Sequence, residues 1–449
     1  MAFHKILIAN RGEIAVRVIR ACRNMGIETV AVYSKEDTSA LHVRLADESV
    51  CIGAGTVRNS YLNMDRIISA ALTTGAEAIH PGFGFLSENS DFARKCQEYG
   101  VVFIGPTGEV MDKMGNKSHA RRTMIEAGVP VIPGTKDPVY DAAEAREIAA
   151  KIGYPVMIKA SSGGGGKGMR VSRSDEDFAI QFSVAQRESV NAFGDNTMYM
   201  EKFVENPRHV EIQIIADTFG NVVALGERDC SVQRNHQKLI EESPSPAITD
   251  ETRREMNRCA VLAAKTVGYT NAGTVEFLVD RDASFYFMEM NTRIQVEHGV
   301  TEMVTGTDLI IEQIRVAEGK KLSFTQEDIK PRGHAIECRI NAEIPERNFM
   351  PSPGVIKNMH LPAGNGVRVD TAVYTGYKIP SEYDSMIAKV IVHAPDREKA
   401  IMKMRSALGE MVITGINTNL DFQYKLMCDP EFCSGKADTG FIERLMNRD

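Results

Sequence analysis

Several features that mark common protein classes are missing from this sequence of 449 residues. No stretch approaches the run of about 18 apolar residues that a membrane-spanning helix needs. The eight cysteines include no CxxC pair and have no histidine-rich neighbourhood, which argues against a zinc site or a disulfide framework. The net charge of -7 excludes the basic excess typical of proteins whose main partner is nucleic acid. We expect reduced, mostly buried thiols at Cys22, Cys51, Cys96, Cys230, Cys259, Cys338, Cys428 and Cys433.

We also expect no secretion signal, because Lys5–Ala9 already has the pattern of a strand. We therefore predict a cytoplasmic protein. Hydrophobic residues make up 43% of the chain and charged residues 25%, as in soluble globular proteins. At roughly 100–200 residues per domain the length predicts about three domains. No internal repeat or low-complexity segment is visible.

Short apolar runs alternate with amphipathic helical patterns from Lys5 to about Gly115, which is typical of an α/β domain with a parallel sheet. The stretch His80–Glu88 contains Gly-x-Gly after a strand, but the third glycine of a dinucleotide fingerprint is missing. We predict strands at Lys5–Ala9, Thr29–Ser34, Glu77–His80 and Val101–Ile104, and helices at Gly12–Met25, Met64–Thr74 and Asn89–Tyr99.

A second domain is expected to begin near Gly128–Gly134, which is dense in proline and glycine and follows a helical pattern at Val110–Ala127. After a helix at Ala142–Ile152, the apolar strand Tyr154–Ala160 leads into a loop with four consecutive glycines, 163–166. It is not a Walker A loop, because Gly168 follows Lys167 where serine or threonine is required. We interpret strand, glycine loop and strand as a flap whose N–H groups close around phosphates, with a simple surface turn as the alternative.

The stretch Glu289–Glu297 carries the most chemistry. If it is extended, its acid, amide and guanidinium side chains lie on one face and its apolar side chains on the other. A hairpin of Thr274–Val279 and Phe285–Met288 would bring Glu276 close to Glu289 and Asn291. Two carboxylates and an amide oxygen suit a nucleotide-bound Mg²⁺ ion. The alternative is the wet face of an ordinary antiparallel strand.

The remaining segments contain further polar and charged stretches among the predicted strands and helices. His209–Ile215 alternates strictly and predicts a strand with a polar face, whereas Glu227–Lys238 is rich in charges and amides and is interpreted as a site loop or a solvated connection. Arg339 stands alone on a predicted strand and by default is a surface ion-pair partner. Helices are expected at Asp250–Val267, Asp308–Glu318, Arg397–Met411 and Leu420–Cys428, and strands at His334–Glu343, Gly354–His360 and Met386–Ala394.

One short motif is not interpreted as a site of biotin attachment. Met402-Lys403-Met404 resembles the tripeptide that carries covalent biotin, but it lies in a charged helical pattern without the glycines of the tight hairpin such a lysine needs.

Taken together, these motifs resemble the ATP-grasp superfamily and, within it, the biotin carboxylase family. The resemblance implies a mixed α/β and α+β fold with three domains. These are an N-terminal Rossmann-like domain (1–114), an ATP-grasp domain with a hinged glycine-rich lid (115–330, lid about 131–204) and a C-terminal α/β domain (331–449). It rests on Ile8–Ala15, His80–Asn89, the glycine flap, Arg208–Gln213, Gln295–Glu302, Arg332–Glu343 and Tyr383–Ile387.

By this resemblance ATP phosphorylates bicarbonate to carboxyphosphate, whose CO₂ then passes to N1 of biotin. Glu297 is expected to be the general base, with a pKa raised by burial or by neighbouring carboxylates. Arg339 is expected to stabilise the biotin enolate. Bicarbonate is assigned to Lys238, Arg293, Gln295 and the backbone of Val296, and Mg²⁺ or Mn²⁺ to Glu276, Glu289 and Asn291. The nucleotide is assigned to Lys117, Lys159, Gly164, Gly165, Gly166, Met169, Glu201, Lys202, Phe203, Val204, His209, Gln233, His236 and Leu278.

The resemblance also implies partners, because the chain has neither a biotinyl domain nor a carboxyltransferase. We expect a homodimer that works with a biotin carrier protein and a carboxyltransferase on other chains, within an acetyl-CoA or pyruvate carboxylase. Two alternatives stay open: another ATP-grasp ligase joining a carboxylate to an amine, and a catalytically silent scaffold protein. The departures from the family pattern are Ser161, Ser162, Lys167 and Gly299. The two serines would stiffen the hinge of the flap, and Gly299 would loosen the turn after the base.

Overall fold

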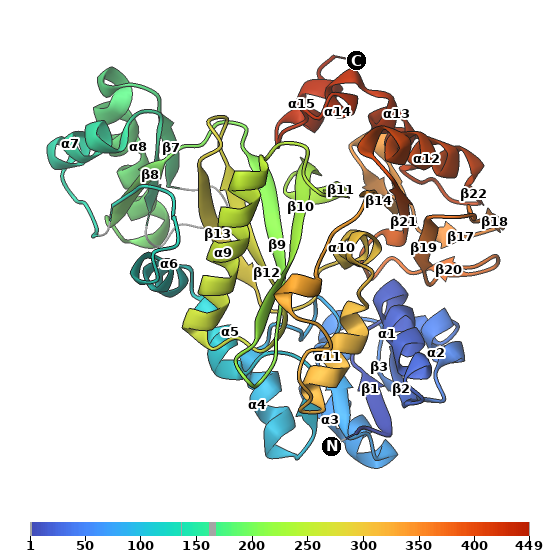
Figure 1. Cartoon of the computed structure of the whole chain (residues 1–449). Coiled ribbons are helices and arrows are strands. Elements are labelled where there is room, and N and C mark those ends of the chain that lie inside the picture. The colour runs from blue at the N-terminus through green and yellow to red at the C-terminus, as the bar shows by residue number, and fades with distance from the viewer. Residues whose placement is uncertain (1, 136, 161–167, 449) are drawn as a thin grey trace. The chain divides into compact units, whose positions relative to one another are not determined.

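A computed structural model describes residues 2–135, 137–160 and 168–448 (Figure 1). It divides into two compact units. The first comprises Met1–Val129, Arg208–Phe277 and Glu289–Asp449, and the second comprises Pro130–Pro207 and Leu278–Met288. The second unit therefore interrupts the first at two places in the sequence. The predicted domains, 1–114, 115–330 and 331–449, follow the family resemblance and not the compactness of the fold, and they stay a prediction.

The N-terminal part of the first unit is built on a parallel sheet of five strands in the order β3-β2-β1-β4-β5. The predicted parallel sheet is thus confirmed, although β3 was not predicted, because polar and exposed residues give it no apolar pattern. The strands are β1 (Lys5–Ile8), β2 (Glu28–Ser34), β3 (Glu48–Gly53), β4 (Ala78–His80) and β5 (Val102–Phe103), and the helices are α1 (Gly12–Asn24), α2 (Leu41–Leu45), α3 (Met64–Thr74) and α4 (Ser90–Glu98).

Side-chain caps set the helix boundaries. Asn63 caps α3 by accepting a hydrogen bond from the N–H of Arg66 (3.0 Å), and Gly75 ends that helix with a φ of +70°. The single helix predicted at Val110–Ala127 is wrong, because Asn116 leaves the helical conformation and caps a new helix. The structure instead has α5 (Gly108–Gly115) and α6 (Lys117–Glu126).

An eight-stranded sheet in the order β13-β12-β9-β10-β11-β14-β21-β19 connects the middle of the chain with its C-terminal part. The stretch interpreted as a site loop, Glu227–Lys238, lies in this sheet, so that interpretation is wrong. Glu227, Arg228 and Lys238 of this stretch form ion pairs inside the protein, which is why it lacks an apolar pattern. The strands are β9 (Arg208–Ala216), β10 (Val222–Arg234), β11 (Gln237–Ser243), β12 (Asn271–Val279), β13 (Phe285–Asn291), β14 (His334–Asn341), β19 (Val367–Thr371) and β21 (Met386–Ala394).

Helices cover this sheet and bury apolar cores against it. One core joins α1 to strands β1 and β9 and to helix α11 (Leu309–Ala317), and another places α12 (Arg397–Glu410) and α13 (Leu420–Cys428) against β14 and β21. The predicted strand Gly354–His360 is two short strands. The other elements are α9 (Asp250–Val267), α10 (His298–Thr305), α14 (Pro430–Cys433), α15 (Phe441–Met446), β15 (Glu343–Ile344), β16 (Met350–Pro351), β17 (Gly354–Val355), β18 (Asn358–His360), β20 (Lys378–Ile379) and β22 (Val412–Thr414).

The second unit is a small α/β body. A three-stranded sheet in the order β7-β6-β8 packs through Ile158 and Met198 against Phe178 and Phe182. The predicted strands on both sides of the glycine loop are confirmed, whereas the long helix α8 was not predicted. The elements are α7 (Ala142–Ile152), β6 (Val156–Ala160), β7 (Met169–Ser172), α8 (Asp175–Phe193) and β8 (Met198–Lys202).

Within the described ranges, no helix combines the length and the apolar character required to cross a bilayer.

A buried ion pair in the N-terminal part of the first unit also contacts an aromatic ring of its C-terminal part. The guanidinium of Arg11 donates to both carboxylate oxygens of Asp37 (2.6 and 2.7 Å) and lies 4.0 Å from the centre of the Tyr383 ring. Asp37 also accepts a hydrogen bond from the hydroxyl of Tyr61 (2.6 Å). The Asp37 side chain is fully buried and also accepts a hydrogen bond from the hydroxyl of Tyr377 (3.4 Å), in the C-terminal part of the unit.

We expect Asp37→Asn to destabilise the protein by about 3–5 kcal/mol, because it leaves the Arg11 charge buried without its partner. Thermal unfolding should begin roughly 5 °C lower or more. The matched control is Asp112→Asn, which breaks a contact of similar length (2.8 Å) to Arg94 between half-exposed side chains. It should leave thermal unfolding nearly unchanged, because water screens an ion pair at the surface. Equal effects of the two variants would contradict this assignment.

Candidate active site

Three buried carboxylates surround one ammonium group in the first unit. The Nζ atom of Lys238, on β11, lies 2.6 Å from Glu211 Oε2, 2.6 Å from Glu297 Oε1 and 3.2 Å from Glu276 Oε1. Glu211 comes from β9, Glu276 from β12 and Glu297 from the turn before α10. Burial disfavours the charge of Lys238, but the surrounding anions outweigh this and raise its pKa well above the usual value.

A second cation lies beside one of these carboxylates. Arg228 is fully buried and lies opposite Glu211 in the register of β10 and β9, and its Nε donates to Glu211 Oε1 (2.5 Å). Its other N–H groups donate to Gln213, Thr274 and Thr301, at 2.7 to 3.1 Å. Arg228 was not predicted from the sequence. The one local signal available was Glu211, which stands between the apolar residues Val210 and Ile212, because Arg228 itself lies between Glu227 and Asp229.

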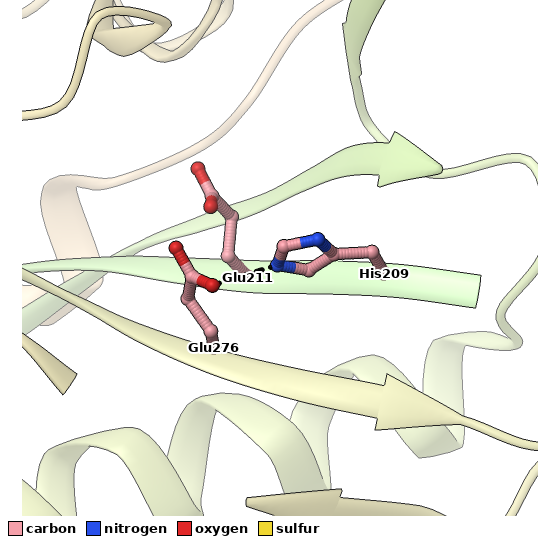
Figure 2. Close-up of side chains that lie close together, drawn as sticks. All are labelled: His209, Glu211 and Glu276. Atoms are coloured by element: carbon pink, nitrogen blue, oxygen red, sulfur yellow. Dashed lines mark hydrogen bonds and ion pairs between the residues drawn. The ribbon is translucent and has the colours of Figure 1, made fainter. Parts of the chain in front are cut away.

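Glu276 is the junction between this cluster and the Glu289–Glu297 stretch. It accepts hydrogen bonds from Asn291 Nδ2 (2.7 Å) and Gln295 Nε2 (3.0 Å), so the predicted convergence of Glu276 and Asn291 is confirmed. Its other oxygen lies 2.8 Å from His209 Nε2 (Figure 2). Burial disfavours ionisation of Glu276, but Lys238 and His209 outweigh it and hold the pKa of the carboxyl well below its usual value.

The stretch is not extended along its whole length. Strand β13 ends at Asn291, and residues 292–297 turn into α10, so the predicted alternation through Glu297 is wrong. The Arg293 side chain therefore does not follow the predicted strand face. Its guanidinium contacts Glu88 (2.8 Å), Gln295 Oε1 (2.7 Å) and Asn291 Oδ1 (3.2 Å). Gln295 therefore connects Arg293 with Glu276. Glu88, which lies 205 positions away in the sequence, was not predicted.

Glu297 lies between two cations. One of its oxygens faces Lys238, and the other lies 3.0 Å from Arg339 Nη2. Arg339 in turn donates through Nε to Glu241 Oε1 (2.6 Å). The default interpretation of Arg339 as a surface residue is therefore wrong, since its side chain is only 15% exposed and holds two buried carboxylates. Glu241 orients this guanidinium and was not predicted.

The pKa of Glu297 was expected to be raised, and this expectation is wrong for the structure described here. Burial disfavours the charge of Glu297, but Lys238, Arg339 and Arg228 outweigh it and place the pKa well below its ordinary value. Neighbouring carboxylates act in the expected direction, but the closer contacts with the cations outweigh them. Glu297 is therefore ionised at neutral pH.

Two groups of side chains lie close enough together to suggest a metal site: His209 with Glu211 and Glu276, and Glu211 with Cys230 and Glu297. In both groups, however, the ammonium of Lys238 already lies against the carboxylates. Burial also raises the pKa of Cys230 well above normal, which disfavours a thiolate ligand. The predicted set of Glu276, Glu289 and Asn291 has the oxygen donors that Mg²⁺ prefers.

The predicted nucleotide residues fall into both units. In the second unit, Lys159 on β6 forms an ion pair with Glu201 on β8, Lys202 lies 3.4 Å from Asp280, and Phe203 N–H donates to Pro155 (2.9 Å). Val204 is buried, and Met169, at the start of β7, is 38% exposed. In the first unit, Gln233 lies near the end of β10, paired with Lys238 of β11, and His236 lies in the turn between the two strands. Gly164, Gly165, Gly166 and the side chain of Lys117 lie outside the described residues, and Leu278 belongs to the second unit.

Three family models match the chain. They are the N-terminal domain of biotin carboxylase (residues 2–111), the ATP-binding domain of the carbamoyl-phosphate synthase L chain (116–325) and the C-terminal domain of biotin carboxylase (337–444). The chain is also 58% identical to Biotin carboxylase 1 of Bacillus subtilis over 440 residues, 98% of each protein.

The chain belongs to the biotin carboxylase family. It is therefore an ATP-dependent ligase built on the three-domain architecture of that family. Among solved structures it resembles the biotin carboxylase domain dimer of the Hydrogenobacter thermophilus 2-oxoglutarate carboxylase in complex with MgADP, ADP and bicarbonate. That match has 49% identity and a TM-score of 0.89, covering 100% of this chain and 98% of that chain. It also resembles the biotin carboxylase component of a pyruvate carboxylase, with 48% identity and a TM-score of 0.92, covering 99% of this chain and 98% of that chain.

We expect Lys238→Ala to let a divalent cation bind beside His209, Glu211 and Glu276, where the ammonium lies in the unaltered protein. Removal of the ammonium leaves Glu211, Glu276 and Glu297 with too little positive charge nearby. In nucleotide-free protein, Zn²⁺ measured by calorimetry should bind at least about tenfold more tightly to the variant. The control is Lys238→Ala combined with His209→Ala, which should lose most of the gain. Tight Zn²⁺ binding to unaltered protein that disappears with His209→Ala would show that Lys238 does not occupy the site.

Proposed function

We propose that the chain catalyses the carboxylation of biotin, with bicarbonate as the source of CO₂ and ATP as the source of energy. The observation that carries this proposal is the ionised Glu297 held between Lys238 and Arg339. This arrangement offers a proton acceptor and two positively charged groups within one buried space. A planar anion with one acidic proton, such as bicarbonate, matches both functions.

In the first step Glu297 accepts the proton of bicarbonate, and the oxygen that is freed attacks the γ-phosphorus of ATP. The products are carboxyphosphate and ADP. Lys238, Arg293, Gln295 and the backbone of Val296 bind the bicarbonate anion, and Arg293 and Gln295 already contact each other at 2.7 Å. Lys159, with its ion pair to Glu201, belongs to the set that holds the nucleotide.

In the second step carboxyphosphate releases CO₂ and phosphate, and the phosphate takes the N1 proton of biotin. The resulting enolate attacks CO₂. Arg339 stabilises the developing negative charge on the ureido oxygen, and Glu241 keeps the guanidinium oriented. Arg339 is suited to this role because it is permanently charged and its Nη2 already lies against an anion.

Mg²⁺ or Mn²⁺ would be held by Glu276, Glu289 and Asn291. When bound, the ion neutralises phosphate charge during transfer. Glu276 is ionised in the structure, as a metal ligand must be. The amide of Asn291 donates to Glu276 through its nitrogen and accepts from Arg293 through its oxygen, so both of these residues orient it.

The biotin substrate is carried by a separate protein, and a carboxyltransferase on another chain completes the overall reaction. We further propose a homodimer in the cytoplasm. The related domain from Hydrogenobacter thermophilus is described as a dimer, which supports the homodimer. The final acceptor is acetyl-CoA, as in fatty acid synthesis, or pyruvate.

Purified protein with ATP, Mg²⁺, bicarbonate and free biotin should release ADP in a biotin-dependent manner. ADP release that depends on an amine and ignores biotin would favour a carboxylate–amine ligase. No turnover with any acceptor, together with intact ATP binding, would favour the silent scaffold. Addition of acetyl-CoA or pyruvate to the complex co-purified with its carboxyltransferase identifies the final acceptor.

We expect Glu297→Gln to lower biotin-dependent turnover by about 10²–10⁴-fold, because the amide cannot accept the proton. Binding of a non-hydrolysable ATP analogue should stay within about twofold of the unaltered protein, since the amide keeps the size of the side chain. Turnover unchanged by Glu297→Gln would contradict the assignment of the base and support the scaffold alternative.

We expect Glu289→Gln to raise the Mg²⁺ concentration needed for half-maximal turnover by about tenfold or more, because it removes one anionic oxygen ligand. The matched control is Glu343→Gln, on β15 outside the site. Half-maximal Mg²⁺ is measured at saturating nucleotide. An unchanged requirement in Glu289→Gln would remove Glu289 from the metal set.

A further inference from the structure

Lys389 is a fully buried lysine that none of the steps above uses. It lies on β21, and its side chain has no exposed surface. Its Nζ atom donates a hydrogen bond of 2.6 Å to the carbonyl oxygen of Val296. Two carboxylates lie farther from this atom, that of Glu13 on α1 at 3.3 Å and that of Asp370 on β19 at 3.9 Å. The backbone carbonyl is therefore a closer partner of this ammonium than either anion.

The carbonyl of Val296 belongs to the peptide unit that leads into Glu297. Because a peptide unit is planar, fixing its oxygen also fixes the N–H of Glu297 and the direction in which the chain enters that residue. Beyond this point, burial of Glu297 leaves little room for its backbone to adjust. A donor at the Val296 oxygen thus constrains where the Glu297 carboxylate lies.

The sheet places a second cation directly beside Lys389. Lys389 and Arg339 are opposite each other in the register of β21 and β14. Arg339 contacts the carboxylate of Glu297, and Lys389 contacts the carbonyl one residue earlier. Strand β14 therefore holds the side chain of Glu297, and its neighbour β21 holds the main chain one residue earlier.

The close approach of α10 to the same strand supports this interpretation. Gly299 lies in the first turn of α10, and a Cβ atom there would lie 2.4 Å from Cδ1 of Ile391 on β21 and 3.3 Å from Glu337 Oε2. Glycine at this position lets the helix start pack closely on the strand. The segment Val296–Gly299 is thus anchored to β21 by a hydrogen bond and by packing.

We infer that Lys389 is a positioning residue for the base, acting through its hydrogen bond to the Val296 carbonyl. This inference rests on the proposed function for its catalytic consequence, since it takes Glu297 as the group that accepts the proton. Loss of the bond lets the Val296–Glu297 peptide rotate. A displacement of about 1 Å at a catalytic group is enough to lower turnover about 10²-fold.

The test compares Lys389→Met with Glu13→Gln in the full-length protein. Lys389→Met removes the donor but keeps an unbranched side chain, whereas Glu13→Gln removes the nearer carboxylate and leaves the carbonyl bond in place. We expect Lys389→Met to lower kcat about 10- to 100-fold with the KM for ATP within about twofold. Glu13→Gln should change kcat less than about threefold, and Lys389→Arg should recover part of the activity because it restores a donor.

Hydrogen exchange provides a readout that does not depend on catalysis. In Lys389→Met the amides of residues 296–300 should exchange at least about tenfold faster, while those of β14 keep their protection. Failure of the unaltered protein to turn over biotin would overturn the proposed function, and the exchange result would still decide whether Lys389 holds this segment. Unchanged exchange, or equal loss of activity in Glu13→Gln and Lys389→Met, would overturn the inference. A general loss of protection in Lys389→Met would do the same, because it would show a structural role only.

Discussion

Charge compensation inside a buried space is the constraint on which the site depends. Glu211, Glu276 and Glu297 are each almost completely buried, and like charges this close would not all ionise without nearby cations. The ammonium of Lys238 contacts all three, which holds the carboxylates together and determines their separation. A lysine suits this position because its three donors radiate from one point. Because of these contacts, the two groups of side chains that resemble a metal site already have the ammonium of Lys238 against their carboxylates.

The fold meets this constraint by drawing charges from strands that are distant in sequence. In the eight-stranded sheet, β12 and β9 supply carboxylates, β10 and β11 supply Arg228 and Lys238, and β14 supplies Arg339. Because β11 pairs with β14, the sheet continues from the central part of the chain into its C-terminal part. An active site assembled on a continuous sheet is held by the backbone hydrogen bonds of several strands, which limits the movement of each charged group.

Local sequence patterns predicted the strands and the hairpin of the site better than they predicted the contacts between its side chains. The β12–β13 hairpin and the meeting of Glu276 with Asn291 followed from alternation and a short polar turn, which are properties of neighbouring residues. The interpretation of Glu227–Lys238 was wrong because buried ion pairs have the composition of a surface loop. The roles of Arg228 and Glu88 depend on pairing with distant segments, and no local pattern encodes that pairing. The direction of the Glu297 pKa shift required a count of surrounding cations, which only the folded chain supplies.

The low pKa of Glu297 has a consequence for how a base of this kind works. A carboxylate held far below its ordinary pKa is always ionised but is a weak proton acceptor, whereas a general base is most effective when its pKa lies near the working pH. Lys238 and Arg339 cause this low pKa, and both are also assigned to substrate anions. Under the proposed function, bicarbonate would take up part of the hydrogen bonding of Lys238, which would leave less stabilisation for Glu297 and raise its pKa. Its basicity would then increase only once the anion that carries the proton is in place, so the cations that weaken the base in the free protein would couple its activation to substrate binding.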